Sequence, residues 1–182
     1  CKFIDAKDVI KFNYDGVVDY DETIALVKEA CNGKKRVLIP GFYGSYINGE
    51  IKLFARGGSD ITGSIVAKSI NATMYENWTD VSGILMADPR IINNPHKIEK
   101  ITYEELRELS YMGASVLHQD AIFPIEGVNI PINILNTNNP LDSGTIISNR
   151  DFQSSRAITG IAGKKDFSCI MITKERYAKK ID

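Results

Sequence analysis

Two opposite charges flank a glycine pair in Arg56-Gly57-Gly58-Ser59-Asp60, at the start of an expected helix. The glycines allow a ligand close to the backbone, and the first turn of a helix presents N–H groups that no helical carbonyl accepts. The planar guanidinium of Arg56 can hold a carboxylate, whereas Asp60 would repel a phosphate and attract an ammonium group. This set predicts a site for a zwitterion such as an amino acid. The alternative is a surface turn in which Ser59 or Asp60 only caps the helix.

A second set of polar residues is formed by Trp78-Thr79-Asp80, after an expected strand, and by Ala87-Asp88-Pro89-Arg90 further along. In open α/β sheets, ligands bind outside the carboxyl ends of the strands. Thr79 and Asp80 offer a hydroxyl and a carboxylate to a base or ribose, and Arg90 offers a cation to phosphate oxygens. The set therefore predicts a nucleotide site. The alternative is a loop held by an internal contact between Asp88 and Arg90.

The histidines and cysteines give no metal-ligand pattern. Cys1, Cys31 and Cys169 are widely spaced and odd in number, which suits a reducing cytosol. His118 follows an apolar pair and is interpreted as a half-buried, hydrogen-bonded side chain rather than a base. His96, in a polar loop, is assigned no role. No metal site is predicted from these residues.

Charge and hydrophobicity exclude two classes of partner. With 22 basic and 23 acidic side chains the net charge is -1, so we expect no binding to a nucleic-acid backbone. No segment approaches the roughly 18 uninterrupted apolar residues that a membrane helix needs, so a soluble protein is expected, and the cysteine pattern favours the cytoplasm. The first residue is Cys1 rather than Met, and the last residues form a charged run. We interpret both as cut ends of a longer protein.

Helical and strand-like segments alternate along the chain, which predicts an α/β fold. The run at 36–40 is continuously apolar, as is typical of a strand buried on both faces. Thr102 and Glu105 have the spacing of a capping box. The expected helices are 19–32, 60–70 and a third from Thr102, and the expected strands are 36–40, 72–77, 131–135 and 145–147, the last two forming a hairpin across a turn at 136–140.

A polar stretch at 150–156 is the best candidate for a linker, with a domain boundary near residue 155. This boundary divides the chain into 1–155 and 156–182. Two strand-like runs, 158–162 and 167–173, follow it and are too short for an independent fold.

Taken together, these motifs resemble those of the aspartate kinases, in the amino-acid kinase superfamily. The likeness extends over essentially the whole chain, in an order and spacing that agree with the family. The segments that carry it are Ile39-Pro40-Gly41-Phe42-Tyr43-Gly44-Ser45, Phe54-Ala55-Arg56-Gly57-Gly58-Ser59-Asp60, Glu76-Asn77-Trp78-Thr79-Asp80, Ala87-Asp88-Pro89-Arg90, Tyr103-Glu104-Glu105, Gly113-Ala114-Ser115-Val116-Leu117-His118 and Asn129-Ile130-Pro131-Ile132.

The resemblance implies a fold and an organisation. Residues 1–155 would be the C-terminal part of a carbamate-kinase-like three-layer sandwich, and 156–182 the opening strands of a regulatory ACT domain. The parent protein would form a homo-oligomer through its ACT domains. The family's N-terminal Lys-Phe-Gly-Gly motif precedes residue 1, so we expect little activity from the isolated chain.

The resemblance also implies site residues. The Arg-Gly-Gly-Ser-Asp motif would bind the substrate L-aspartate, with Arg56 on its α-carboxylate and Asp60 on its ammonium group as the catalytic pair. Many members have a Tyr where this chain has Leu85 and a Lys where it has Ser115. The loss of that lysine cation leaves more charge neutralisation to Arg90 and Mg²⁺. The implied ATP contacts are Thr79, Asp80, Leu85, Arg90, Ser115 and Val116.

The implied reaction transfers the γ-phosphoryl group of ATP to the side-chain carboxylate of L-aspartate. The product is 4-phospho-L-aspartate, at the first step of lysine, threonine and methionine biosynthesis. That carboxylate has a pKa of about 3.9 and is already ionised at neutral pH, so no general base is needed. Mg²⁺ is expected with ATP. The alternatives are a sibling amino-acid kinase with another substrate, and a non-catalytic module that binds or senses a ligand.

Overall fold

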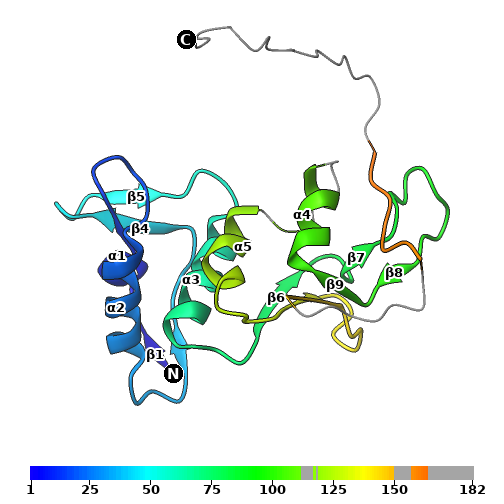
Figure 1. Cartoon of the computed structure of the whole chain (residues 1–182). Coiled ribbons are helices and arrows are strands. Elements are labelled where there is room, and N and C mark those ends of the chain that lie inside the picture. The colour runs from blue at the N-terminus through cyan, green and yellow to red at the C-terminus, as the bar shows by residue number, and fades with distance from the viewer. Residues whose placement is uncertain (112–116, 118, 150–156, 164–182) are drawn as a thin grey trace, which may run out of the picture.

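A computed structural model describes residues 1–111, 117, 119–149 and 157–163 and shows a mixed α/β architecture. The predicted fold class is confirmed. Figure 1 shows α1 and α2 at one end of the molecule, α3 and α5 in the middle, and α4 with β7, β8 and β9 at the other end. The helices are α1 (Ala6–Val9), α2 (Tyr20–Cys31), α3 (Gly58–Ser69), α4 (Tyr103–Tyr111) and α5 (Gln119–Glu126).

The strands of the described residues form four sheets. The largest has the order β6-β10-β11-β9, in which β10 runs parallel to β6 and antiparallel to β11. A second pairs β1 with β3, a third has the order β2-β4-β5, and a fourth pairs β7 with β8. The strands are β1 (Lys2–Phe3), β2 (Lys11–Phe12), β3 (Val37–Leu38), β4 (Tyr43–Tyr46), β5 (Ile51–Leu53), β6 (Tyr75–Thr79), β7 (Ile84–Leu85), β8 (Lys97–Ile98), β9 (Lys100–Thr102), β10 (Ile132–Asn136) and β11 (Thr145–Ser148).

The helix starts follow from local capping chemistry. Asp19 caps α2 by accepting a hydrogen bond from the backbone N of Glu22 (3.1 Å). At the start of α4, Oε2 of Glu105 accepts from the N of Thr102 (2.9 Å), and Oγ1 of Thr102 accepts from the N of Glu105 (3.1 Å). This reciprocal pair confirms the predicted capping box.

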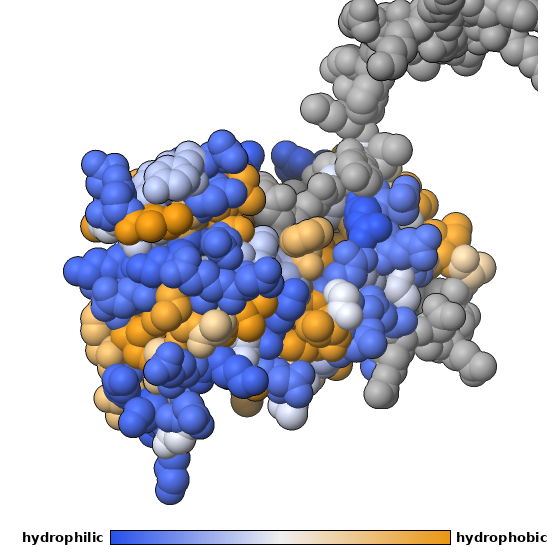
Figure 2. All heavy atoms as spheres, turned by 60° about the vertical axis from the view of Figure 1, so that its left-hand side comes forward, coloured by the Kyte–Doolittle hydropathy of each residue, from blue (hydrophilic) through white to orange (hydrophobic). Residues whose placement is uncertain are grey.

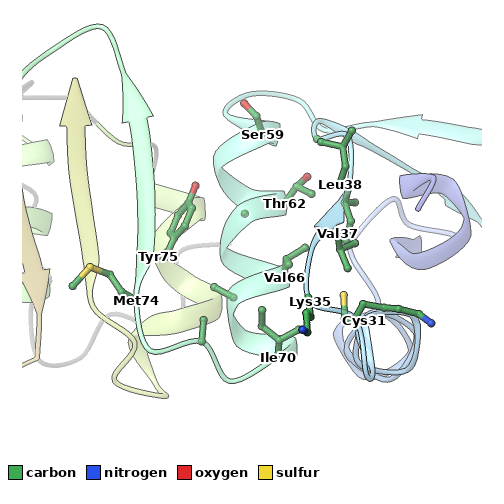
Figure 3. A pocket seen from close by; sticks show the side chains of 16 residues that line it. Cys31, Lys35, Val37, Leu38, Ser59, Thr62, Val66, Ile70, Met74 and Tyr75 are labelled. Carbon is green, nitrogen blue, oxygen red and sulfur yellow. The ribbon is translucent and has the colours of Figure 1, made fainter. Parts of the chain in front are cut away.

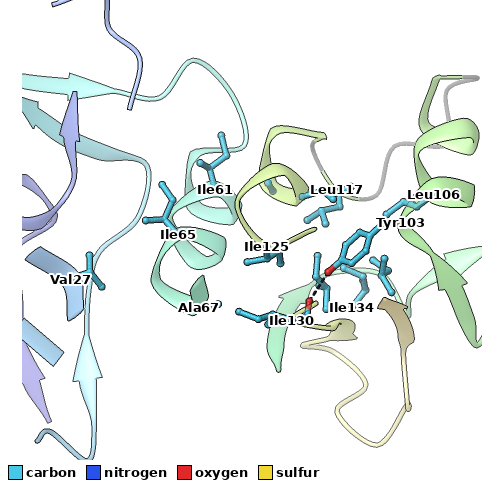
Figure 4. Close-up of a cluster of buried hydrophobic side chains, with 14 of the residues drawn as sticks. Val27, Ile61, Ile65, Ala67, Tyr103, Leu106, Leu117, Ile125, Ile130 and Ile134 are labelled. Atoms are coloured by element: carbon cyan, nitrogen blue, oxygen red, sulfur yellow. Dashed lines mark hydrogen bonds between the residues drawn. The ribbon is translucent and has the colours of Figure 1, made fainter. Parts of the chain in front are cut away.

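The core lies where α3 packs against α5 and both meet the largest sheet (Figure 4). Ile65 of α3, Ile125 of α5 and Ile134 of β10 are completely buried. Tyr103 is also buried, and its hydroxyl donates to the backbone O of Ile130 (2.6 Å), so the polar end of the ring is satisfied. This core fixes α3 relative to β6, which is the relationship on which the site below depends.

The prediction of a fully buried strand at 36–40 is wrong in both the length and the burial of the strand. Only Val37–Leu38 is a strand, and Leu38 is 57% exposed. The reason is that β3 pairs with β1 along one edge, and within the described residues no strand pairs with its other edge. An apolar run indicates that a segment prefers to be covered, but it does not show what covers it.

Two other predicted strands differ from the structure. The strand expected at 72–77 begins only at Tyr75, because the end of α3 continues into a turn in which the N of Ala72 bonds to the O of Ala67 (2.9 Å). The run at 158–162 has no strand in the structure, and Ile161 bonds through its N to the O of Met86 (2.7 Å). The runs at 150–156 and 167–173 lie outside the described residues.

The predicted hairpin is confirmed. β10 and β11 pair antiparallel, with Ile132 opposite Ile147, on either side of a connection at 137–144 that begins one residue later than the turn predicted at 136–140. None of the helices in the described part of the chain is long and apolar enough to cross a membrane.

Candidate active site

Glycines at the start of α3 allow its backbone to pack directly against the backbone of the turn at 41–42. Gly57 is the N-cap residue in the left-handed region (φ 61°), which favours glycine. A methyl group on Gly58 would lie 2.8 Å from the Cα of Phe42, and one on Gly41 would lie 2.9 Å from the Cα of Ser59. The turn at 41–42 therefore lies directly against the first turn of α3, as only glycine permits.

Phe42 has a strained backbone at this contact, with φ 66° in the region that bulky residues avoid. Its N donates to Oγ1 of Thr62 (3.3 Å), and its O accepts from the N of Phe54 (3.0 Å). Thr62 in turn donates to the O of Gly58 (2.7 Å). Strain of this kind gathers at functional sites. Sequence reasoning assigned Phe42 no role, and its only signal was the preceding Pro-Gly.

The capping alternative for Ser59 and Asp60 is wrong. Gly57 is the N-cap residue, and no side-chain hydrogen bond caps α3. The first backbone bond of the helix runs from the N of Ile61 to the O of Gly57 (3.0 Å), so the N–H groups of Gly58, Ser59 and Asp60 precede the helical ladder. Gly58 is buried, whereas Ser59 is exposed. The helix start therefore keeps donors for an anionic group beside an exposed hydroxyl.

Asp60 is fixed against β6. Nδ2 of Asn77 donates to Oδ1 of Asp60 (2.9 Å) and to the hydroxyl oxygen of Tyr75 (2.9 Å). The Tyr75 hydroxyl donates to the backbone O of Asp60 (3.3 Å). Burial raises the pKa of Tyr75 to about 12, so the phenol stays neutral at physiological pH. These bonds join the helix start to the strand that ends at Thr79.

Arg56 lies in the loop before Gly57, and its side chain is exposed. Within the described residues it forms no ion pair, and it does not contact Asp60. Its guanidinium is therefore available to a ligand. The structure places Arg56 and Asp60 on either side of the Gly57–Ser59 turn without joining them.

Thr79 and Asp80 lie at the carboxyl end of β6, as predicted. Thr137, just beyond the end of the parallel strand β10, donates to the O of Thr79 through both its N (2.8 Å) and its Oγ1 (2.9 Å). Oγ1 of Thr79 donates to Oδ1 of Asp80 (3.3 Å). The two strand ends thus form one edge with exposed polar groups.

Arg90 follows β7 and contacts Asp88, as the alternative interpretation of this loop expected. Nη2 of Arg90 donates to Oδ2 of Asp88 (2.6 Å), and Nε donates to Oδ1 (3.0 Å). These bonds lower the pKa of Asp88 and raise the pKa of Arg90. The Arg90 side chain is still 86% exposed. Because Asp88 occupies Nε and Nη2, the pair orients the guanidinium and leaves its Nη1 side for an anion.

The remaining predicted residues are placed as follows. Leu85 of β7 pairs with Lys97 of β8 and is partly exposed. Ser115, Val116 and His118 lie outside the described residues. His96 accepts a backbone hydrogen bond from Met86 through its O (2.8 Å), and no role emerges for its side chain.

A groove of about 660 Å³ runs along α3 between β3 and β6 (Figure 3). Its lining is mainly apolar, and one end reaches Ser59 at the start of α3. Figure 2 shows hydrophobic patches among polar side chains on the face seen when the left-hand side of Figure 1 is turned forward. Sequence reasoning missed this groove. The residues labelled in it are Cys31, Lys35, Val37, Leu38, Ser59, Thr62, Val66, Ile70, Met74 and Tyr75.

A glycine-built helix start beside the carboxyl edge of a parallel strand pair is an arrangement at which α/β proteins bind small ligands. A sequence profile of the amino acid kinase family matches residues 1–136. The chain therefore belongs to the amino acid kinase family.

Within that family the chain is similar to aspartokinases. The crystal structure of Clostridium acetobutylicum aspartate kinase is 55% identical with a TM-score of 0.84, over 89% of this chain and 38% of that chain. Aspartokinase 3 of Bacillus subtilis (strain 168) is 44% identical over 80% of this chain and 32% of its own length. The E. coli aspartokinase III structure in complex with aspartate and ADP is 28% identical with a TM-score of 0.77, over 84% and 35%. The chain thus spans about a third of the length of these relatives.

Proposed function

We propose that this chain is part of an aspartate kinase, which as a whole transfers the γ-phosphoryl group of ATP to the side chain of L-aspartate. The observation that carries the proposal is the hydrogen bond between Asn77 and Asp60 (2.9 Å). The bond joins the Arg-Gly-Gly-Ser-Asp helix start to a residue two positions before Thr79, the first of the proposed nucleotide contacts. An amino-acid site and a nucleotide site at one sheet edge are what this transfer requires.

Arg56 and Asp60 would hold the two charges of the amino acid. The free guanidinium of Arg56 would donate to the α-carboxylate, and the carboxylate of Asp60 would accept from the ammonium group. The N–H groups of Gly58 and Ser59, with Gly57 leaving room beside them, would complete the cradle. E. coli aspartokinase III, solved with aspartate and ADP, is the relative that supports aspartate as the ligand.

The nucleotide would lie along the carboxyl edge of β6 and β7. Thr79 and Asp80 are suited to the base or ribose, Leu85 to an apolar face of the nucleotide, and Arg90 to phosphate oxygens. The exposed guanidinium of Arg90, already oriented by Asp88, fits an anionic ligand. Ser115 and Val116 complete the proposed set. Mg²⁺, bound with ATP, would neutralise part of the phosphate charge.

The reaction needs positioning rather than acid–base chemistry. An oxygen of the ionised aspartate side chain forms a bond to the γ-phosphorus, while the bond from that phosphorus to the ADP oxygen breaks. No proton is transferred, because the attacking carboxylate is already ionised at neutral pH. Arg56 and Asp60 contribute by holding the nucleophile in line with the phosphoryl group.

The same proposal covers the organisation of the protein. Residues 1–155 are the rear part of the kinase domain, and 156–182 open an ACT domain through which the parent enzyme forms homo-oligomers. The enzyme works in the cytoplasm in the pathway to lysine, threonine and methionine. The partly exposed β3 and the groove beside it support this view, because the rest of a kinase domain would cover them.

The test is ADP release by the full-length protein with L-aspartate, L-glutamate or UMP as acceptor. We expect turnover with L-aspartate and at least a hundredfold less with the other two. The isolated 182-residue chain should show little or no turnover. Turnover with UMP or glutamate would favour a sibling kinase. No turnover, together with calorimetric binding of lysine or threonine alone, would favour a regulatory module.

A further inference from the structure

Asn77 is a buried polar side chain in the middle of β6. It is the third residue of β6, lies opposite Ile134 of β10, and is only 8% exposed. A buried amide without partners would be unfavourable, so its two hydrogen bonds account for its presence there. One bond goes to Asp60 at the start of α3, and the other goes to Tyr75 of the same strand.

The direction of these bonds is fixed by chemistry. A carboxylate cannot donate, so the NH₂ group of Asn77, and not its oxygen, must face Oδ1 of Asp60. The second hydrogen of that NH₂ group goes to the hydroxyl oxygen of Tyr75. The Tyr75 hydroxyl hydrogen is then directed to the backbone O of Asp60. Asp60 is therefore held at its side chain by Asn77 and at its backbone by Tyr75.

Gly63 allows this arrangement. A methyl group at Gly63 would lie 2.6 Å from the hydroxyl oxygen of Tyr75 and 2.7 Å from its Cζ. The Tyr75 ring therefore lies directly on α3, less than one turn beyond Asp60. Because the ring cannot move toward the helix, the acceptor that it offers to Asn77 is also fixed.

We propose that Asn77 is a positioning residue for the amino-acid substrate. It holds Oδ1 of Asp60 so that Oδ2 is directed at the substrate ammonium group. Within the described residues no other side chain bonds to that carboxylate, so Oδ2 is available for this contact. The inference rests on the proposed function, because it requires Asp60 to bind the ammonium group.

The test uses the full-length protein and two substitutions of Asn77. Asn77→Leu keeps the size of the side chain and removes both donors. We expect it to raise the KM for L-aspartate about tenfold and to leave the KM for ATP within about twofold, as for loss of a hydrogen bond to a charged group. Glu76→Gln, on the exposed neighbouring position of the same strand, is the matched control and should change neither KM.

Asn77→Asp keeps the size of the side chain and replaces the donor with a second carboxylate, which repels that of Asp60. We expect a larger rise in the KM for L-aspartate than in Asn77→Leu, with the KM for ATP again within about twofold. Tyr75→Phe, which removes one acceptor, should give a smaller rise in KM, of about threefold.

The outcomes separate the inference from the proposed function. If the wild-type protein turns over L-aspartate and folded Asn77→Leu has an unchanged KM for it, the positioning role is wrong and the function stands. If Asn77→Leu does not fold, Asn77→Asp decides, and an unchanged KM for L-aspartate in that variant overturns the role. If the wild-type protein shows no turnover with L-aspartate, the proposed function fails and the inference fails with it.

Discussion

The hydroxyl of Thr159 donates to Oε1 of Glu105 (2.5 Å), and so ties the residues after the proposed domain boundary to the capping box of α4. Oε2 of the same carboxylate accepts from the N and Oγ1 of Thr102 (2.9 Å each). Two residues further, Ile161 bonds to Met86 of the loop that leads to Arg90. The segment at 157–163 therefore connects the start of α4 to the proposed nucleotide loop.

Removing this tie should destabilise the protein. Thr159→Val keeps the shape of the side chain and deletes one hydrogen bond, for an expected loss of about 1 kcal/mol in the free energy of unfolding. Thr73→Val, at an exposed position, is the control and should have no measurable effect. Denaturant unfolding of the full-length proteins measures both. Equal stability of the two variants would show that the tie contributes nothing.

The effect of Thr159→Val should depend on pH. Partial burial alone would raise the pKa of Glu105, but hydrogen bonds from Thr159 and Thr102 outweigh it, so the pKa lies below its ordinary 4.5. A lowered pKa means that the stabilisation is fully present above the ordinary value and is lost as the pH falls through the folded-state pKa. The difference between wild type and variant should therefore be constant from pH 6 to 8 and shrink below pH 4.5.

Gly58→Ala should damage the site through the backbone contact with Phe42. The added methyl would lie 2.7 Å from the Cβ of Phe54 and 2.8 Å from the Cα of Phe42, so the turn must move. We expect a loss of about 1–3 kcal/mol in stability and a raised KM for L-aspartate. Gly127→Ala is the matched control, because its methyl meets nothing within 4 Å. Identical kinetics and stability of the two variants would show that the close contact between Gly58 and Phe42 matters neither for the site nor for stability.

Arg56→Lys tests the carboxylate contact. Lysine keeps the charge and loses the planar pair of donors, so the KM for L-aspartate should rise about tenfold or more while the KM for ATP is unchanged. Lys52→Arg, a conservative change on β5, serves as the control. An unchanged KM for L-aspartate in Arg56→Lys would show that a residue other than Arg56 binds the α-carboxylate.

Asp88→Asn tests whether the internal contact orients Arg90 for the nucleotide. The pair is exposed, so we expect only a two- to fivefold rise, roughly, in the KM for ATP and none in that for L-aspartate. The pKa of Asp88 is already lowered by Arg90, so the group stays ionised from pH 5 to 9 and should add no titration to the KM for ATP there. Asp15→Asn, in an exposed turn, is the control. A rise in both KM values would indicate a structural role instead.

Local chemistry explains which elements could be predicted from the sequence. Glu105 lies three residues from Thr102, and β10 and β11 are consecutive strands joined by the connection at 137–144, so residues close in the sequence carry both signals. The exposure of Leu38 could not be predicted in this way, because it depends on which strands lie beside β3.

The same distinction between local signals and tertiary contacts applies to the candidate site. The glycines and charges of 56–60 are adjacent in the sequence, so their chemistry is visible there. The bond from Asn77 to Asp60 joins residues 17 positions apart and exists only because α3 packs on β6 in this register. The strained backbone of Phe42 likewise follows from a tertiary contact with Gly58 and not from its own residue type.

The most direct test of the account is to trap the product. An acyl phosphate reacts with hydroxylamine to give a hydroxamate, so the full-length protein with ATP, Mg²⁺, L-aspartate and hydroxylamine should accumulate aspartyl hydroxamate in step with ADP. The account predicts equal amounts of the two products and none when L-aspartate is omitted. ADP formation from L-aspartate without hydroxamate, or hydroxamate from another acceptor in its place, would contradict it.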